Sequence, residues 1–140
     1  GLAAYGNPNK AYKYISKMIS YDKINKCFKG NYEKGLYIAH YDNPNIKFLK
    51  KKYSSKDIAS AAQKRIEEVI LEFIEDNIPY GSKLALAGGI FANVKINQKI
   101  CELKRINEIF VFPNMGDGGL SVGCAALTYN EKSKLPLKKN

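Results

Sequence analysis

The sequence predicts an α/β fold in which parallel strands alternate with helices, and three observations support this prediction. Two short, uninterrupted apolar runs, residues 84–87 and 109–112, have the length and composition of strands that are buried on both faces. Segments with helical periodicity precede, separate and follow these runs. A glycine cluster lies beyond the end of each run, where ligands bind in folds of this kind. Both glycine clusters are therefore candidate ligand-binding loops.

Length and composition are those of one globular domain. The chain has 140 residues, of which 45% are hydrophobic and 26% charged, so it is too apolar to be disordered. No apolar stretch approaches the ~20 residues that a membrane-spanning helix needs. Cys27, Cys101 and Cys124 lie far apart, and His40 is the single histidine. This usage excludes an autonomous zinc site and predicts a reduced, cytoplasmic protein.

The net charge of +10 raises the question of nucleic-acid binding. The cations comprise 21 lysines and 2 arginines, and the lysines are spread along the chain. Arginine is the preferred residue for bidentate contacts to phosphates and bases, and its scarcity favours a compositional bias over a nucleic-acid surface. A basic nucleic-acid-binding or interaction module remains the alternative from a different functional class.

Residues 1–53 have weaker signals than the rest of the chain. Residues 9–20 could form a short helix, and residues 21–28 and 36–40 could form strands separated by glycines. His40 lies next to Tyr41 and Asp42 and could act as an acid–base group. With no supporting motif, a surface or turn histidine is the simpler interpretation.

The first strong helix begins at Ser54 or Ser55, either of which can cap it, and Pro79 ends it. Asp57 lies where a carboxylate interacts favourably with the positive end of the helix dipole. Apolar residues recur at helical spacing and predict one buried face. They are Ile58, Ala61, Ala62, Ile66, Val69, Ile70, Phe73 and Ile74.

Two further helices are expected over residues 90–104 and 120–129. The second contains the small residues 123–126, which predict close packing on the sheet or on another lobe. In that packing Cys124 is a small core residue. The tail after Asn130 is polar and is expected to fray.

Gly88 and Gly89 join the first strand to the helix that follows it. Without Cβ atoms the backbone can adopt positive φ and admit a ligand closely, and a helix N-terminus favours a phosphate. The alternative is a tight turn with no ligand. The pair matches neither a Walker loop nor a dinucleotide fingerprint.

Asp117 lies between Gly116 and Gly118 in the second glycine loop. A carboxylate on so flexible a backbone can reach a metal or a phosphate-bound cation. Alternatively, Asp117 forms an Asx-turn or caps the next helix. Since both loops follow a strand and open a helix, we expect them to face one cleft.

Several motifs occur in an order that matches one known family. They are GLAAYG at residues 1–6, DIASAAQ at 57–63 with EEV at 67–69, LALAGGIFAN at 84–93, PNMGDGG at 113–119 and GCAA at 123–126. The corresponding family patterns are G-L-A-x-Y-G, D-L-A-A-S-x-Q with E-E-V, L-x-L-A-G-G-V-A-x-N, P-x-x-G-D-x-G and G-A-A, and this sequence is similar to each of them. Together they resemble the O-carbamoyltransferases of the nodulation-protein and antibiotic-tailoring type. Related tRNA threonylcarbamoyl-transfer proteins share the glutamine helix and G-G-V-x-x-N, although P-x-x-G-D-x-G favours the former family.

The resemblance implies an incomplete domain of ribonuclease-H-like fold, in the actin-like ATPase superfamily. Residues 1–130 would form the second of two lobes, with residues 7–53 as a variable insertion and residues 131–140 as a polar tail. The resemblance also implies transfer of a carbamoyl group, via carbamoyl-AMP made from carbamoyl phosphate and ATP, to a hydroxyl of a sugar or natural product.

The same resemblance implies the site. ATP or carbamoyl-AMP would bind near Gly88, Gly89, Asn93, Gly116 and Gly118, and Asp117 would be a ligand of a divalent metal, iron(II) in this family. The family's other metal ligands, an H-x-x-x-H motif, do not occur in this sequence. The expected partners are the remaining lobe, the carbamoyl-AMP-forming domain and a small-molecule or sugar acceptor, not a membrane or nucleic acid. We therefore expect a fragment of a longer enzyme that is inactive alone.

Overall fold

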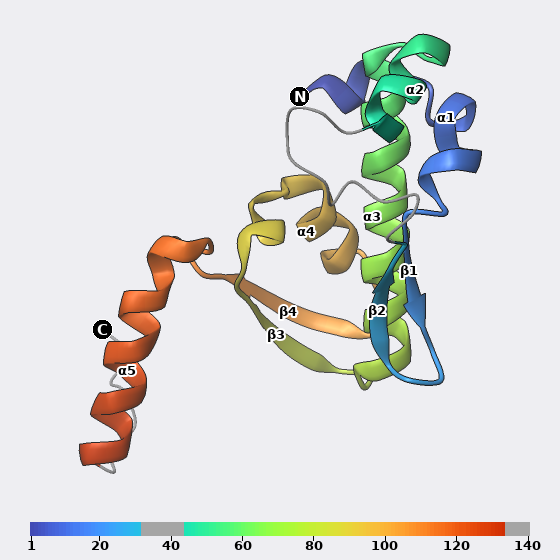
Figure 1. The fold of residues 1–140 in the computed structure, drawn as a ribbon. Coiled ribbons are helices and arrows are strands. Elements are labelled where there is room, and N and C mark those ends of the chain that lie inside the picture. The colour runs from blue at the N-terminus through green and yellow to red at the C-terminus, as the bar shows by residue number, and fades with distance from the viewer. Residues whose placement is uncertain (32–43, 134–140) are drawn as a thin grey trace. The chain divides into compact units, whose positions relative to one another are not determined.

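The computed structural model describes residues 1–31 and 44–133, and it confirms a mixed α/β architecture (Figure 1). The chain forms two compact units, Gly1–Pro79 and Tyr80–Asn140. Within the described ranges, the first unit holds an antiparallel pair of strands and the second holds a parallel pair.

The first unit is built around one long helix, α3, which spans Ser55–Asn77 as the sequence predicts. The Ser54 side chain caps it by accepting the Asp57 N–H at 3.1 Å. Helix α1 (Pro8–Ile15) lies beside α3, and a 3-10 turn, η1 (Leu2–Tyr5), precedes α1 and also contacts α3 (Figure 1).

The core of the first unit contains side chains from α1, α3 and a further helix, α2 (Pro44–Lys52). Partly buried residues, most of them aromatic, pack around this core, so apolar burial holds the three helices together. The buried residues are Ala11, Ile15, Leu49 and Ala61, and the partly buried ones are Tyr12, Tyr14, Met18, Tyr53 and Ile58.

Strands β1 (Ile19–Asp22) and β2 (Cys27–Gly30) form an antiparallel hairpin. The strand expected over residues 21–28 is therefore wrong, because that segment includes the turn of the hairpin. The Asp22 carboxylate accepts two N–H groups of this turn, a local interaction that favours the reversal of the chain.

The structure also corrects two other expectations for residues 1–53. The helix expected over residues 9–20 ends at Ile15, because the chain from Ile19 onward pairs in the hairpin. Helix α2 was not expected at all, and its single buried residue is Leu49. The strand expected over residues 36–40 lies outside the described residues, as does His40.

The second unit contains the predicted strand–helix–strand arrangement. Strands β3 (Ser82–Leu86) and β4 (Ile106–Val111) are parallel, and helix α4 (Val94–Cys101) connects them. A 3-10 turn, η2 (Gly89–Ala92), occupies the start of the helix expected over residues 90–104, so α4 begins later. Ile96 and Ile100 are the buried residues of α4.

The expectation that both strands are buried on both faces is wrong for the described structure. Burial alternates along β3, where Leu86 is buried and Ala85 is exposed. On β4 the Phe110 side chain is 57% exposed. Because successive residues of a strand point to opposite faces, one face of this two-stranded sheet is left uncovered within the second unit.

The last elements are the 3-10 turn η3 (Asp117–Gly119) and helix α5 (Leu120–Ser133). Helix α5 has no buried residue, and Cys124 is exposed. The expectation that Cys124 is a small core residue is therefore wrong: nothing in the described part of the second unit covers that side of α5. Among the described helices, none combines the length and the apolar character needed to cross a membrane.

Candidate functional site

The two glycine loops meet at the carboxyl ends of the parallel strands. The Gly88 N–H donates to the Met115 carbonyl with N and O 2.6 Å apart, which joins the two loops directly. Just before them, the Phe112 N–H donates to the Leu86 carbonyl at 3.0 Å and extends the strand ladder. Parallel pairing brings the two strand ends to the same edge of the sheet, and the loops that follow therefore meet there.

Gly88 has the backbone conformation that the sequence suggested. Its φ is +109°, a value that residues with a Cβ rarely adopt, and the space where its Cβ would lie is open. The glycine therefore serves the turn itself and leaves room beside it. Gly89 and Gly116 also have open space at the Cβ position, although neither has a positive φ.

Gly118 and Gly119 have a packing role instead. A Cβ on Gly119 would lie 2.2 Å from the Asn114 carbonyl oxygen and 3.0 Å from the Phe112 ring. A Cβ on Gly118 would lie 2.7 Å from the Asn114 side-chain nitrogen. These two glycines let the loop fold tightly over Asn114, and this packing sets the position of Asp117.

Asp117 is the first residue of η3 and is exposed. Its carboxylate accepts no hydrogen bond from any residue that the structure describes. This finding does not support the alternative that its side chain forms an Asx-turn or caps α5, since either would show a bond to a nearby N–H. The carboxylate is free to interact with a ligand.

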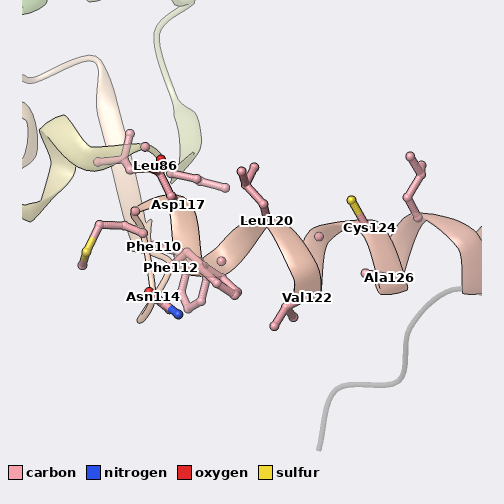
Figure 2. A pocket seen from close by; sticks show the side chains of 17 residues that line it. Leu86, Phe110, Phe112, Asn114, Asp117, Leu120, Val122, Cys124 and Ala126 are labelled. Carbon is pink, nitrogen blue, oxygen red and sulfur yellow. The ribbon is translucent and has the colours of Figure 1, made fainter.

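A pocket of about 510 Å³ opens where the loops meet α5 (Figure 2). Asp117 lies at the end of the pocket near the strands, and Leu120, Val122 and Cys124 continue along α5 (Figure 2). Most of the lining is apolar. The lining residues are Ala85, Leu86, Ala87, Gly88, Phe110, Phe112, Asn114, Met115, Gly116, Asp117, Gly119, Leu120, Val122, Gly123, Cys124, Ala126 and Leu127.

The pocket brings together three of the six residues that the sequence suggested, Gly88, Gly116 and Asp117. Gly89, Gly118 and Asn93 do not line it. The Asn93 side chain caps α4 by accepting the N–H groups of Lys95 and Ile96. This bonding gives Asn93 a structural role and occupies two of the first N–H groups of α4 that a phosphate could otherwise use.

Sequence reasoning missed the apolar part of the pocket. Phe110, Leu120, Val122 and Leu127 line it and are more than half exposed. Phe110 lay in a strand that was expected to be buried, and no local pattern separates an apolar residue of a core from one of an open pocket.

One known protein family matches almost the whole of this chain. The family model described as the carbamoyltransferase N-terminus matches residues 1–126. The chain belongs to the carbamoyltransferase family. The match covers η1 at the beginning, both glycine loops and the first half of α5, so every lining residue of the pocket except Leu127 lies within the matched range.

Individual relatives agree with this family. The chain is 34% identical over 133 residues to the uncharacterized protein MJ1058 of Methanocaldococcus jannaschii, an alignment that covers 90% of the chain and 21% of that protein. It is 26% identical over 129 residues to the 3′-hydroxymethylcephem-O-carbamoyltransferase of Amycolatopsis lactamdurans, covering 89% and 23%.

A third relative is the nodulation protein NolO of Bradyrhizobium diazoefficiens, with 24% identity over 143 residues, covering 94% of the chain and 24% of that protein. The chain therefore spans between a fifth and a quarter of the length of these relatives. No solved structure matches it significantly.

A divalent metal would find one suitable ligand in this pocket. Asp117 is the sole carboxylate of the lining, and the part of the chain that the structure describes holds no group of three His, Cys, Asp or Glu side chains that could surround an ion. One carboxylate rarely holds a metal tightly. The residues present would therefore fit only a shared site, to which this chain would contribute Asp117 and other parts of a protein the further ligands.

Proposed function

We propose that this chain is the second lobe of an O-carbamoyltransferase, which transfers a carbamoyl group to a hydroxyl of a sugar or natural product. The observation that carries the proposal is the hydrogen bond from Gly88 to Met115, because it places both glycine loops and Asp117 at one pocket. The name of the cephem carbamoyltransferase among the relatives supports a hydroxyl-bearing acceptor.

In this proposal each loop has a defined task. The open backbone at Gly88 admits the phosphate of ATP or of carbamoyl-AMP, since no side chain blocks the approach. Asp117 holds a divalent metal, iron(II) in our proposal, with its exposed carboxylate. When bound, such a metal polarises the carbamoyl group toward attack by the acceptor hydroxyl. Asp117 then acts as a ligand and not as a base.

The apolar lining indicates how the pocket is completed. Phe110, Leu120, Val122 and Leu127 expose a continuous apolar lining beside Asp117, and a surface of this kind normally packs against another part of a protein. We propose that the remaining lobe of a ribonuclease-H-like pair covers this lining. That lobe would bring the missing metal ligands to Asp117, and a further domain would form the carbamoyl-AMP.

The test is the substitution Asp117→Ala in the intact enzyme, assayed for ATP-dependent carbamoyl transfer from carbamoyl phosphate. We expect transfer to be abolished while the urea unfolding midpoint stays unchanged, because the carboxylate is exposed and makes no hydrogen bond within the described residues. We also expect the 140-residue chain alone to be inactive, because it supplies one metal ligand.

The matched control is Glu108→Gln, which removes an exposed carboxylate of the same unit that pairs with Lys83 at 2.6 Å on the surface. This variant should retain full turnover. Normal turnover in the Asp117→Ala enzyme would contradict the role of Asp117 as a metal ligand. Product formation by the 140-residue chain alone would contradict the proposal that the metal site is shared with another lobe.

A further inference from the structure

The positive charge of the protein is concentrated in one part of the sequence. Residues 1–56 contain twelve lysines and three acidic residues, whereas residues 57–140 contain eleven cations and ten acidic residues. The first segment therefore carries nine of the ten net positive charges. It includes α1 and α2, neither of which contains an acidic residue.

One of these lysines, Lys52, lies against aromatic rings where α1 and α2 approach each other. The Lys52 ammonium donates to the Tyr14 hydroxyl at 3.0 Å and lies 5.1 Å from the Tyr14 ring centroid and 5.7 Å from that of Tyr53. The Phe48 and Tyr14 ring centroids are 5.6 Å apart. Packing against the rings restrains the lysine, so its charge is held in place and not spread over many rotamers.

No carboxylate of the described residues neutralises this charge. Within residues 1–31 and 44–133, Lys17 and Lys52 form no ion pair with a carboxylate. The ammonium of Lys52 lowers the pKa of Tyr14, first through their hydrogen bond and then through its charge, and Lys13 and Lys17 act in the same direction. The direction of this shift indicates a positive potential at the Tyr14 hydroxyl.

A pocket of about 230 Å³ lies beside these groups. Its two aromatic residues, Tyr14 and Phe48, offer rings for stacking, and Lys17 stands at its edge as an exposed cation. The volume suits a single ring that carries a small charged group, and it is too small for a folded segment. The lining residues are Tyr14, Lys17, Met18, Asn45, Phe48 and Leu49.

We propose that the α1–α2 pocket, defined by these six residues, binds a small organic anion: a phosphate or carboxylate attached to a ring. The ring packs against Tyr14 and Phe48, and the anion faces Lys17. Lys52 does not line the pocket and adds positive charge beside it, where it donates to the Tyr14 hydroxyl. Both arginines of the chain, Arg65 and Arg105, lie outside residues 1–56, which disfavours RNA or DNA as the occupant. The site is independent of the carbamoyl-transfer proposal.

The experiment is a calorimetric titration of the protein with phenyl phosphate, benzoate, phenol and inorganic phosphate. We expect phenyl phosphate or benzoate to bind, and phenol and inorganic phosphate to bind at least about tenfold more weakly, since each lacks one of the two interactions. The stronger of the two aryl anions distinguishes a phosphate from a carboxylate ligand. The variants Lys52→Gln and Lys17→Gln should each weaken aryl-anion binding by about five- to tenfold.

Lys23→Gln is the matched control, because Lys23 is an exposed lysine of the same unit in the hairpin turn and has no part in the pocket. It should leave the dissociation constant unchanged, and a circular dichroism spectrum should show that all variants fold. The proposal is overturned if neither aryl anion binds, if inorganic phosphate binds as tightly as phenyl phosphate, or if Lys23→Gln weakens binding as much as Lys52→Gln. Tighter binding of single-stranded RNA than of any aryl anion, lost in the same variants, would also overturn it.

Discussion

At the scale of single residues, Asp57 shows how one carboxylate can serve a structural purpose. Its side chain accepts the Asn7 N–H at 2.7 Å and the Lys10 ammonium at 3.2 Å. The sequence placed Asp57 at the start of a helix, where it complements the dipole, and this is confirmed. Only the structure shows that the same carboxylate, through these two hydrogen bonds, also connects the beginning of α1 to α3.

We predict that Asp57→Ala lowers the urea unfolding midpoint at pH 7. The Asn7 N–H, then the Ser54 hydroxyl and Lys10, hold the pKa of Asp57 below its usual value in the folded protein. A lowered folded-state pKa means that the carboxylate contributes stability above about pH 4, where an unfolded aspartate is ionised, and loses it as the pH falls through the folded-state value. The difference in midpoint between wild type and variant should therefore be largest near neutrality and shrink in acid.

The control for this prediction is Asp117→Ala, which removes an aspartate that accepts no hydrogen bond within the described residues. Its midpoint should match the wild type at pH 7. A pH-independent difference between wild type and Asp57→Ala would show that the loss arises from packing and not from the charge of Asp57.

At the scale of secondary-structure elements, aromatic packing joins the β1–β2 hairpin to α3. The Phe73 ring of α3 lies 5.6 Å from that of Tyr21 in β1, edge to face, and 5.1 Å from that of Phe28 in β2. The Tyr21 hydroxyl donates to the Asp76 carboxylate at 2.5 Å and accepts from Asn77 at 2.7 Å. A two-stranded hairpin is marginal alone, so these contacts stabilise it.

We predict that Phe73→Ala destabilises the protein by about 2 kcal/mol, because it removes apolar burial and two ring contacts together. Urea unfolding followed by far-ultraviolet circular dichroism measures this change. Phe110→Ala is the matched control: the same substitution at a side chain that is 57% exposed should cost less than about 0.5 kcal/mol. Equal effects of the two substitutions would contradict the proposed role of the aromatic cluster.

At the scale of the whole molecule, the uncovered apolar lining of the second unit should affect behaviour in solution. Leu120, Val122 and Leu127 on α5 are 67%, 53% and 61% exposed, and they lie beside the exposed Phe110. Apolar surface of this extent favours association, because contact removes it from water.

We predict that the purified 140-residue chain self-associates in a concentration-dependent manner, as measured by sedimentation velocity. The double variant Leu120→Glu/Leu127→Glu should sediment as a monomer, since two carboxylates make the same contact unfavourable. Ile24→Glu is the control, because Ile24 is 92% exposed in the hairpin of the other unit and should not change the association. If the wild-type chain stays monomeric at high concentration, the apolar lining does not act as an association surface.

The sequence alone determined the features that depend on local interactions. The cap and periodicity of α3, the two apolar strands and the glycine turns were all predicted, because each depends on neighbouring residues and on the geometry of the backbone. The parallel pairing and the meeting of Gly88 with the Asp117 loop followed from strand–helix alternation and its topology.

Only the tertiary structure decided what is buried and which distant side chains meet. The open face at Phe110 and the exposure of Cys124 depend on what packs against them, and hydrophobicity does not carry that information. The contact of Tyr14 with Lys52 joins residues 38 positions apart, through the packing of two helices, one of which the sequence did not predict. Local patterns encode the conformation of the backbone, whereas burial and long-range contacts are properties of the assembled chain.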